Sequence, residues 1–400
     1  MSKVLLHSSE LKGRVVAPPS KSAAHRALIC SYLAGGGTVK PIINSNDMRA
    51  TVGVINSLKN NEPLVNCIES GSTMRFMIPV AATLGRTITF SGEGSLLSRT
   101  VGEYINLLPK HNVEVKCNGY LPMTISGKLK NGNFEVAGDV SSQYITGLLL
   151  ALANLDGDSA VVLTTELQSK PYVDMTVKVM KDYGVEVTET DFGYLIHGGQ
   201  NYKKIDYNVE GDWSQAAFFL VAGAINGDVE VCGLDMNSTQ GDKAILDVLK
   251  SFGADVQINE SSVVVKKGTL KAADVNAANI PDLVPIIAVM ASFAEGKTVI
   301  SGAERLRYKE SDRIESVVSN LRLLGVDVEE TGDGMIINGQ CALKNAKLNG
   351  FNDHRILMAF SVAALAVDGE VEISDAESIN KSYPSFFEDY NKLGGKADVI

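Results

Sequence analysis

Residues 216–231 read AAFFLVAGAINGDVEV: an apolar run ends at a glycine turn and passes into alternating apolar and polar residues. A run that is apolar on most faces predicts a helix buried on all sides, and the alternation after the turn predicts a short strand. Copies of this pattern occur six times along the 400 residues, at 26–40, 75–90, 144–162, 216–231, 285–300 and 355–373. The repeated element is therefore a buried helix followed by a strand.

A second, amphipathic helix follows five of the six copies and closes on a Gly or Asn turn before another strand, at residues 105–115, 179–187, 247–256, 320–328 and 389–399. A period of about 70 residues is too long for a solenoid and is typical of a packed helix–strand–helix–strand unit. Six units divide most simply as three plus three, which predicts an α/β protein of two similar domains. The first unit is short, and we expect a pair of strands to be missing between Lys59 and Cys67.

The composition excludes several classes of function. A net charge of −10 argues against nucleic acid or an acidic membrane as the main partner. Five cysteines, with no closely spaced pair, predict reduced thiols in a cytoplasmic protein. The start of the chain has no long apolar region, and the apolar runs end before about 18 residues, so we expect neither a signal peptide nor a membrane span. The histidine spacing and the glycine pattern give no reason to expect a metal or a cofactor.

Polar residues open several of the buried helices. The segments are PPSKSAAHRAL (18–28), ESGSTMRF (69–76), VSSQYITG (140–147) and GDWSQAA (211–217). Free backbone N–H groups and the positive end of the helix dipole make a helix start a binding site for anions. A single start of this kind is more often an ordinary capped helix. Its repetition predicts that several helix starts converge on an anionic ligand.

Cations gather in the loops although the protein is negatively charged overall. They occur in LLSRTV (96–101), ERLRYKESDRIES (304–316), FNDHRILM (351–358) and NKSYPSFF (380–387). A charge run is ordinarily a solvated surface. Here the cations interrupt the repeat units just before helices, which is typical of binding to a small, multiply anionic substrate by bidentate arginines.

The motifs SKSAAHRAL, SSQYITGLL, SKPYVDMT, YKESDRI and NDHRILMAFS resemble, in order and at similar spacing, those of the EPSP synthase family of enolpyruvyl transferases. The resemblance extends over nearly the whole chain. It implies an inside-out α/β barrel architecture, in which each domain has three βαβαββ units with buried parallel helices and outer sheets. It also implies that residues 1–19 and 212–400 form the domain with the acid/base and phosphoenolpyruvate-clamp residues, and that 20–211 form the domain with the shikimate 3-phosphate motifs.

The reaction that the resemblance implies is transfer of the enolpyruvyl group of phosphoenolpyruvate to the 5-hydroxyl of shikimate 3-phosphate, by addition and then elimination of phosphate. Two polyanions side by side repel one another unless cations lie between them, and the chemistry needs both an acid and a base. The implied catalytic residues are Asp282 as the base, with Lys21, Glu310 and Lys309 handling protons and charge. From the residues alone, Asp282 is more simply a cap of the helix that follows it.

The resemblance also implies two sets of substrate ligands and a protein that acts as a monomer on small molecules. The ligands of shikimate 3-phosphate are expected to be Lys21, Ser22, Arg26, Ser141, Ser142, Gln143, Ser169, Tyr172, Asp282 and Lys309. Those of phosphoenolpyruvate are expected to be Lys21, Gly71, Arg99, Gln143, Arg313, Arg355 and Lys381.

The chain departs from the family pattern at three positions: Glu69 replaces an Asn, Phe76 replaces a Pro, and Arg305 stands where some members have an Asn. Two alternatives remain from the sequence. A UDP-N-acetylglucosamine enolpyruvyl transferase should carry Asn after Lys21 and a Cys in the loop at 96–101, and this chain has neither. A non-catalytic relative that binds phosphorylated metabolites should have lost Lys21 or Asp282.

Overall fold

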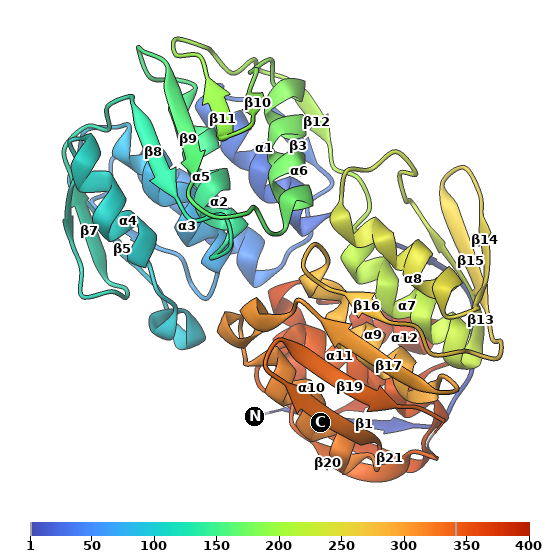
Figure 1. Cartoon of the computed structure of the whole chain (residues 1–400). Coiled ribbons are helices and arrows are strands. Elements are labelled where there is room, and N and C mark those ends of the chain that lie inside the picture. Colours follow the sequence, from blue (N-terminus) through green and yellow to red (C-terminus); the bar gives the residue numbers. More distant parts are fainter. Residues whose placement is uncertain (1, 341) are drawn as a thin grey trace. The chain divides into compact units, whose positions relative to one another are not determined.

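The computed structural model describes residues 2–340 and 342–400, which divide into two compact units (Figure 1). Unit 1 consists of Met1–Pro19 and Glu210–Ile400, and unit 2 of Ser20–Val209. Gly211 forms an antiparallel bridge with Pro19, and the amide of Asp212 donates to the carbonyl of Pro18 at 2.8 Å. The division after Val209 lies two residues before the boundary expected after Gly211.

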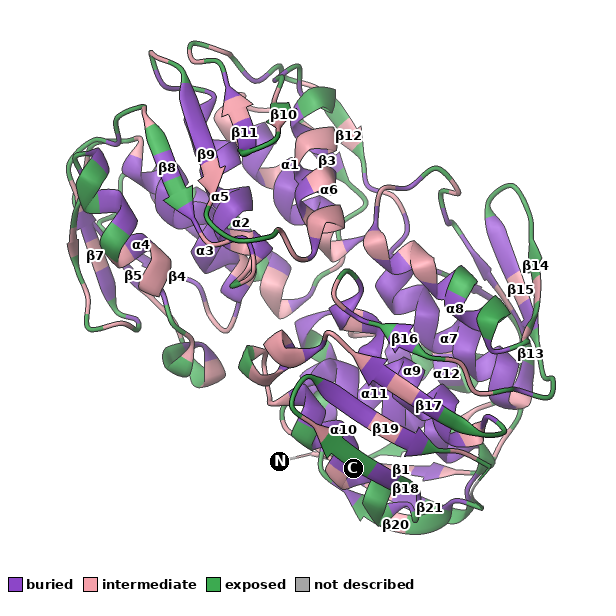
Figure 2. Cartoon of the chain, viewed as in Figure 1, coloured by how far each residue is buried: buried purple, intermediate pink, exposed green. Residues whose placement is uncertain are grey.

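Three buried helices that contact one another form the centre of unit 1: α7 (Trp213–Asn226), α9 (Val284–Phe293) and α11 (His354–Ala363). They are buried along almost their whole length (Figure 2), as their apolar sequences predict. The amphipathic helices are α8 (Ile245–Ser251), α10 (Arg313–Leu323) and α12 (Phe386–Lys392). Short 3₁₀ helices connect these elements: η3 (Gly241–Ala244), η4 (Pro281–Leu283), η5 (Glu304–Tyr308), η6 (Ala364–Ala366) and η7 (Ala376–Lys381).

Three four-stranded sheets of the same topology occur in unit 1. The first has the order β14 (Asp255–Ile258), β15 (Ser262–Lys266), β13 (Gly227–Cys232) and β2 (Leu11–Val16). The second has the order β16 (Val275–Asn276), β17 (Lys297–Ser301), β19 (Gly334–Asn338) and β18 (Asp327–Thr331). The third has the order β20 (Lys344–Leu348), β21 (Asp368–Ser374), β1 (Lys3–His7) and β22 (Lys396–Val399).

The strand that follows each buried helix lies inside its sheet, parallel to an edge strand on one side and antiparallel to a hairpin strand on the other. In the third sheet the hairpin position is filled by strands from opposite ends of the sequence, because β1 lies between β21 and β22. This repeated topology is that of the expected βαβαββ unit, and the predicted α/β fold class is confirmed.

The same plan recurs in unit 2. Its buried helices are α1 (Lys21–Leu33), α3 (Gly71–Ala82) and α5 (Ser142–Leu152), and the others are α2 (Asn46–Lys59), α4 (Gly102–Leu107), α6 (Lys170–Asp182), η1 (Gly94–Ser98) and η2 (Leu108–His111). One sheet has the order β4 (Leu64–Asn66), β5 (Ile88–Ser91), β7 (Met123–Ser126) and β6 (Glu114–Lys116). Another has the order β10 (Thr188–Thr190), β11 (Gly193–Ile196), β9 (Ser159–Leu163) and β8 (Asn133–Val136).

The remaining sheet of unit 2 has two strands, β12 (Asp206–Asn208) and β3 (Thr38–Lys40), which are parallel. In the described chain, α2 leads directly to β4 of the neighbouring sheet, and no hairpin follows it. The first unit therefore lacks the pair of strands that was expected to be missing between Lys59 and Cys67. Among the described residues, no helix combines the length and apolarity that a membrane crossing requires.

Candidate active site

Four of the predicted site residues meet in unit 1 around the carboxylate of Asp282, which lies on η4 just before α9. Arg313 Nη1 donates to Asp282 Oδ1 at 2.9 Å, and Arg355 Nη2 donates to Oδ2 at 2.9 Å. Lys309 Nζ lies 3.8 Å from Oδ1. The structure thus brings together residues from three separate segments, and both carboxylate oxygens of Asp282 face cations.

The ionisation of Asp282 reflects two opposing effects. Burial alone would raise its pKa, because the charged form loses water. The positive charges of Arg355, Lys309 and Arg313 outweigh burial and hold the pKa of Asp282 well below its usual range, although Glu310 opposes them. Asp282 is therefore a carboxylate whose basicity is suppressed as long as these cations face it.

Arg313 is the most buried member of this group, with a side chain that is 1% exposed. Its Nε donates to Asp353 Oδ2 at 2.8 Å, and its Nη2 donates to Glu310 Oε2 at 2.7 Å and to Asp353 Oδ1 at 3.3 Å. Burial lowers the pKa of Arg313, but the charges of Asp353, Glu310 and Asp282 raise it further, so the net shift is upward. Each guanidinium nitrogen therefore has a carboxylate partner.

Asp353 is a residue of this site that the sequence reasoning missed. It is fully buried and caps α11, where it accepts from the backbone amide of Arg355 at 2.9 Å. Its other contacts are the bidentate pair with Arg313 and the hydroxyl of Ser311 at 3.2 Å. The signal that could have found it is an Asp at the cap of a helix whose first turn carries a predicted arginine.

The start of α7 also reaches this group, through Arg355. Arg355 Nη2 donates to the hydroxyl of Ser214 at 3.1 Å, and this hydroxyl donates to Asp212, the cap of α7, at 2.7 Å. Arg355 Nη1 donates to the carbonyl of Asp282 at 3.3 Å. The first turns of α7 and α11 and the η4 turn before α9 therefore converge on one guanidinium.

Lys381, at the end of η7, is buried and holds the turn that leads into α11. Its Nζ donates to the carbonyl of Asn352 at 2.7 Å. Phe351 and Asn352 have φ angles of 52° and 48°, in the left-handed region that non-glycine residues rarely adopt.

Arg305, a departure from the family pattern, donates to the carbonyl of Ala278 at 2.8 Å in the loop that precedes Asp282.

In unit 2, Lys21 is the first residue of α1 and forms an ion pair that was not predicted. Its Nζ lies 2.7 Å from Oδ2 of Asp47, which belongs to the first turn of α2, and both side chains are mostly buried. Ser20 caps α1 by accepting from the amide of Ala23 at 3.3 Å. The starts of α1 and α2 are thus joined through Lys21 and Asp47.

Arg26 is buried one turn further along α1 and links this helix to α6. Its Nη1 donates to the carbonyl of Ser22 at 2.7 Å, and its Nη2 donates to the carbonyl of Tyr172 at 2.8 Å. Its Nε donates to the hydroxyl of Thr176 at 2.8 Å, and its Cζ lies 5.1 Å from the centre of the Phe76 ring. Burial lowers the pKa of Arg26 to about 10. The Phe in place of the family's Pro therefore provides a ring for this guanidinium.

Ser141 and Ser142 open α5, with Ser141 as the cap that accepts from the amide of Gln143 at 3.3 Å. The Gln143 side chain is held from both ends: Arg75 Nη1 donates to its Oε1 at 2.8 Å, and its Nε2 donates to Ser72 Oγ at 2.9 Å. Arg75 and Ser72 lie in a segment that the sequence singled out without assigning it a role beyond Gly71.

Ser169 precedes α6 with φ 55° and ψ 38°, a left-handed conformation that is costly for serine, and its side chain is buried. Such a conformation persists only where its surroundings enforce it, and it is more frequent at functional sites than elsewhere.

Gly71 and Arg99 are in direct contact. A Cβ atom at Gly71 would lie 2.6 Å from Nη1 of Arg99, so the guanidinium lies against the backbone at the start of α3, and any larger residue at position 71 would have to push it aside. Glu69, which replaces an Asn of the family pattern, accepts from the amide of Ser95 at 3.0 Å. Ser95 belongs to η1, which leads to Arg99, so Glu69 fastens this loop.

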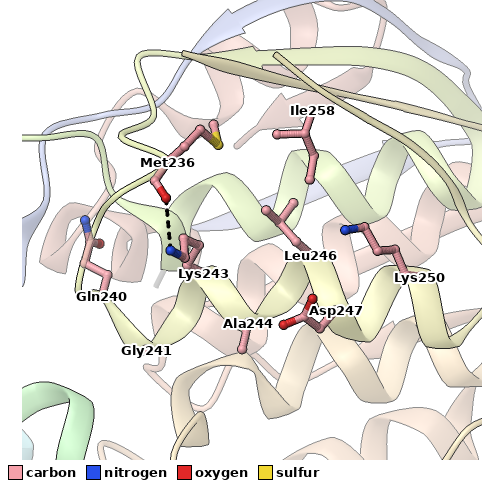
Figure 3. Close-up of a pocket in the computed structure, with 9 residues that line it drawn as sticks. All are labelled: Met236, Gln240, Gly241, Lys243, Ala244, Leu246, Asp247, Lys250 and Ile258. Carbon is pink, nitrogen blue, oxygen red and sulfur yellow. Dashed lines mark hydrogen bonds between the residues drawn. The ribbon is translucent and has the colours of Figure 1, made fainter. Parts of the chain in front are cut away.

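One hollow in unit 1 contains none of the predicted site residues. Its volume is about 410 Å³, and it lies beside α8, where Leu246, Lys250 and Ile258 are among the lining residues (Figure 3). Lys243 Nζ donates to the carbonyl of Met236 at 3.0 Å across one end. Within the described residues, no group of three or more His, Cys, Asp and Glu side chains is arranged to hold a metal ion.

The sequence matches a known protein family over most of its length. The family described as EPSP synthase (3-phosphoshikimate 1-carboxyvinyltransferase) matches residues 6–390. A curated relative, the 3-phosphoshikimate 1-carboxyvinyltransferase of Clostridium kluyveri, is 42% identical, with 100% of this chain and 99% of the relative covered. The proteins of the same name from Clostridium novyi and Methanocorpusculum labreanum are 40% and 41% identical, with at least 98% of each chain covered.

Solved structures have the same fold. The EPSP synthase of Acinetobacter baumannii aligns with a TM-score of 0.83 and 25% identity over 100% of both chains. An enolpyruvyl transferase of Streptomyces tendae aligns with a TM-score of 0.81 over 100% of this chain and 99% of the other, and at 16% identity this likeness concerns the fold alone.

Proposed function

This chain belongs to the EPSP synthase family, the 3-phosphoshikimate 1-carboxyvinyltransferases, and on that premise we propose which of its residues perform each part of the reaction. The protein is an enzyme of aromatic amino-acid biosynthesis by the shikimate pathway. It transfers the enolpyruvyl group of phosphoenolpyruvate to the 5-hydroxyl of shikimate 3-phosphate and releases phosphate. The resemblance inferred from the motifs is confirmed, and neither alternative, the UDP-N-acetylglucosamine enzyme or a non-catalytic relative, is favoured by the full-length matches.

Asp282 is the proposed base. It takes the proton of the 5-hydroxyl as that oxygen bonds to C2 of phosphoenolpyruvate, while an acid among Lys21, Glu310 and Lys309 protonates C3 to a methyl group. The C–O bond to phosphate then breaks, and the methyl group returns a proton to restore the double bond. Each proton transfer by a positioned side chain contributes about 10²–10⁴-fold to the rate.

The observation that best supports Asp282 as the base is that its carboxylate faces three cations, Arg313, Arg355 and Lys309. These three cations balance the carboxylates of Asp282, Glu310 and Asp353, with which they form ion pairs. An anionic substrate that takes over hydrogen bonds from Arg355 would remove a charge that suppresses the basicity of Asp282. Binding of phosphoenolpyruvate would thereby make Asp282 a stronger base.

The substrate ligands are proposed as two sets. For shikimate 3-phosphate they are Lys21, Ser22, Arg26, Ser141, Ser142, Gln143, Ser169, Tyr172, Asp282 and Lys309. For phosphoenolpyruvate they are Lys21, Gly71, Arg99, Gln143, Arg313, Arg355 and Lys381. The contact between Gly71 and Arg99 supports the phosphoenolpyruvate set, because it shows that two residues of this set lie side by side.

Arg355→Lys should raise the KM for phosphoenolpyruvate about tenfold or more, and that for shikimate 3-phosphate much less. Lysine keeps the charge but loses the planar fork that contacts Asp282 and Ser214, and a hydrogen bond to a charged group is worth about 1.5–3 kcal/mol. Phosphate release measured against each substrate in turn checks this. Arg322→Lys, on the exposed face of α10, is the matched control. Equal changes for both substrates, or none, would refute the assignment of Arg355.

We also propose that the enzyme is a monomer of the cytoplasm. The described cysteines, Cys30, Cys67, Cys117 and Cys232, are free thiols, as is usual in a reducing compartment. Light scattering of the purified protein, with and without both substrates, should give the mass of one chain. The mass of two chains at micromolar concentration would contradict the proposed monomer.

A further inference from the structure

The first turn of α3 contacts two residues proposed to bind phosphoenolpyruvate, Gln143 and Arg99. Residues four apart on a helix share a face, and Gly71 and Arg75 are so spaced. Gly71 gives room to the Arg99 guanidinium, and Ser72 accepts from the amide nitrogen of Gln143. Arg75 is the remaining polar side chain of this face, and the family motif assigns it no role.

Arg75 is held firmly in place. It is 6% exposed, and its Cζ lies 5.3 Å from the centre of the Tyr144 ring. Its own carbonyl accepts from the hydroxyl of Tyr104 at 2.6 Å, and a Cβ atom at Gly147 would lie 2.3 Å from that carbonyl oxygen, so α5 packs closely against α3 here. The described residues give its guanidinium no carboxylate partner, so its charge is not neutralised locally.

The hydrogen bond from Arg75 determines which way the Gln143 amide faces. A guanidinium can only donate, so the atom of Gln143 that lies 2.8 Å from Arg75 Nη1 must be the carbonyl oxygen. The amide nitrogen then faces the opposite way, towards Ser72 Oγ at 2.9 Å. This nitrogen carries two hydrogens and Ser72 uses one. Gln143 is only half-buried, so the second N–H can donate to a ligand oxygen.

The same guanidinium fixes the backbone beside Arg99. Arg75 Nη2 donates to the carbonyl of Thr100 at 3.0 Å, and Thr100 directly follows Arg99 in the chain. Tyr144 donates from its hydroxyl to the same carbonyl at 3.0 Å. Arg75 thereby joins the start of α5, which carries Gln143, to the segment that carries Arg99.

We propose that Arg75 is a positioning residue for phosphoenolpyruvate, which turns the Gln143 amide so that its N–H group faces the ligand and holds the backbone that carries Arg99. This inference rests on the proposed function, in which Gln143 and Arg99 contact that substrate. An amide turned the other way would present a carbonyl oxygen to an anion and repel it. Arg75 acts through these two residues and need not touch the substrate itself.

Arg75→Met should raise the KM for phosphoenolpyruvate about tenfold, because it removes both donors and keeps much of the apolar stem. The KM for shikimate 3-phosphate should change less than about twofold. Arg75→Lys, which keeps one donor, should lie between the wild type and Arg75→Met. Arg86→Met is the matched control: Arg86 also donates to a backbone carbonyl, that of Leu58 at 3.0 Å, and belongs to the turn after α3. It should leave both constants unchanged.

A double-mutant cycle with Gln143→Ala separates this inference from the proposed function. If Arg75 acts through Gln143, the two changes together should raise the KM for phosphoenolpyruvate by less than the product of the single effects. An unchanged KM in Gln143→Ala would refute the proposed contact of Gln143. A raised KM in Gln143→Ala, with none in Arg75→Met or with fully multiplicative effects, would overturn the role of Arg75. Should Arg75→Met fail to fold, Arg75→Lys decides: wild-type constants for both substrates would overturn it.

Discussion

Asp282→Asn should lower kcat by about 10²–10⁴-fold while the affinity for shikimate 3-phosphate stays within a fewfold of the wild type. The amide keeps the shape of the carboxylate but cannot take up the proton of the 5-hydroxyl. Phosphate release at saturating concentrations of both substrates gives kcat, and calorimetric titration gives the affinity for shikimate 3-phosphate. Turnover close to that of the wild type would remove Asp282 from the mechanism.

The cations around Asp282 lead to a second expectation for Asp282→Asn, which would not hold if Asp282 had only a structural role. Without the carboxylate, Arg355 and Arg313 lose a competing anion, so the KM for phosphoenolpyruvate should stay the same or fall. Asp327→Asn, an exposed change on β18 in the same unit, is the control and should alter neither constant. A rise in this KM together with the loss of kcat would indicate general damage to the site instead of loss of the base.

The effect of pH on this residue has a definite direction. The pKa of Asp282 is held below the value of about 3.9 that an unperturbed aspartate has. Its contribution to stability is therefore complete above that ordinary value, and it is lost only as the pH falls through the lower pKa of the folded state.

Asp353→Asn should destabilise unit 1 by about 3–5 kcal/mol, the typical cost of removing one partner from a buried ion pair. Arg313 has nowhere to regain water, because its side chain is 1% exposed and Asp353 contacts two of its nitrogens. Asparagine still caps a helix well, so this variant isolates the lost charge from the lost cap. Asp353→Ala should cost about 1 kcal/mol more.

Urea unfolding followed by tryptophan fluorescence measures the loss of stability of unit 1 in Asp353→Asn. Trp213 is the single tryptophan of the chain, and it is fully buried at the start of α7 in unit 1. Its signal therefore reports on unit 1, whatever happens in unit 2. Asp158→Asn, which changes an exposed aspartate of unit 2, should leave the transition unmoved. A midpoint for Asp353→Asn equal to that of the wild type would contradict the importance of the buried pair.

The sequence predicted the features that depend on local pattern. Burial of α7, α9 and α11 followed from their continuous apolar runs, and the missing hairpin between Lys59 and Cys67 followed from the shortness of the first repeat unit. That Asp282, Lys309, Arg313 and Arg355 belong to one site came from the family resemblance and could not be derived from spacing. The structure shows that these four side chains meet.

The residues that the sequence could not reveal are those that act on another side chain. Asp353, Asp47 and Arg75 each hold a predicted site residue, and their partners lie far away in the sequence, 68 residues in the case of Arg75 and Gln143. A contact between residues so far apart produces no periodic pattern in the sequence from which it could be predicted.

The position of β1 between β21 and β22 has a consequence for how the protein emerges from the ribosome. Unit 2 is one continuous stretch, and every strand that pairs within it has left the ribosome once Val209 has emerged. The strands β1 and β2 are translated before it but have no partners until β13, β21 and β22 follow. The nascent chain therefore completes the inserted unit first, while β1 and β2 keep unpaired edges until β13, β21 and β22 have been translated.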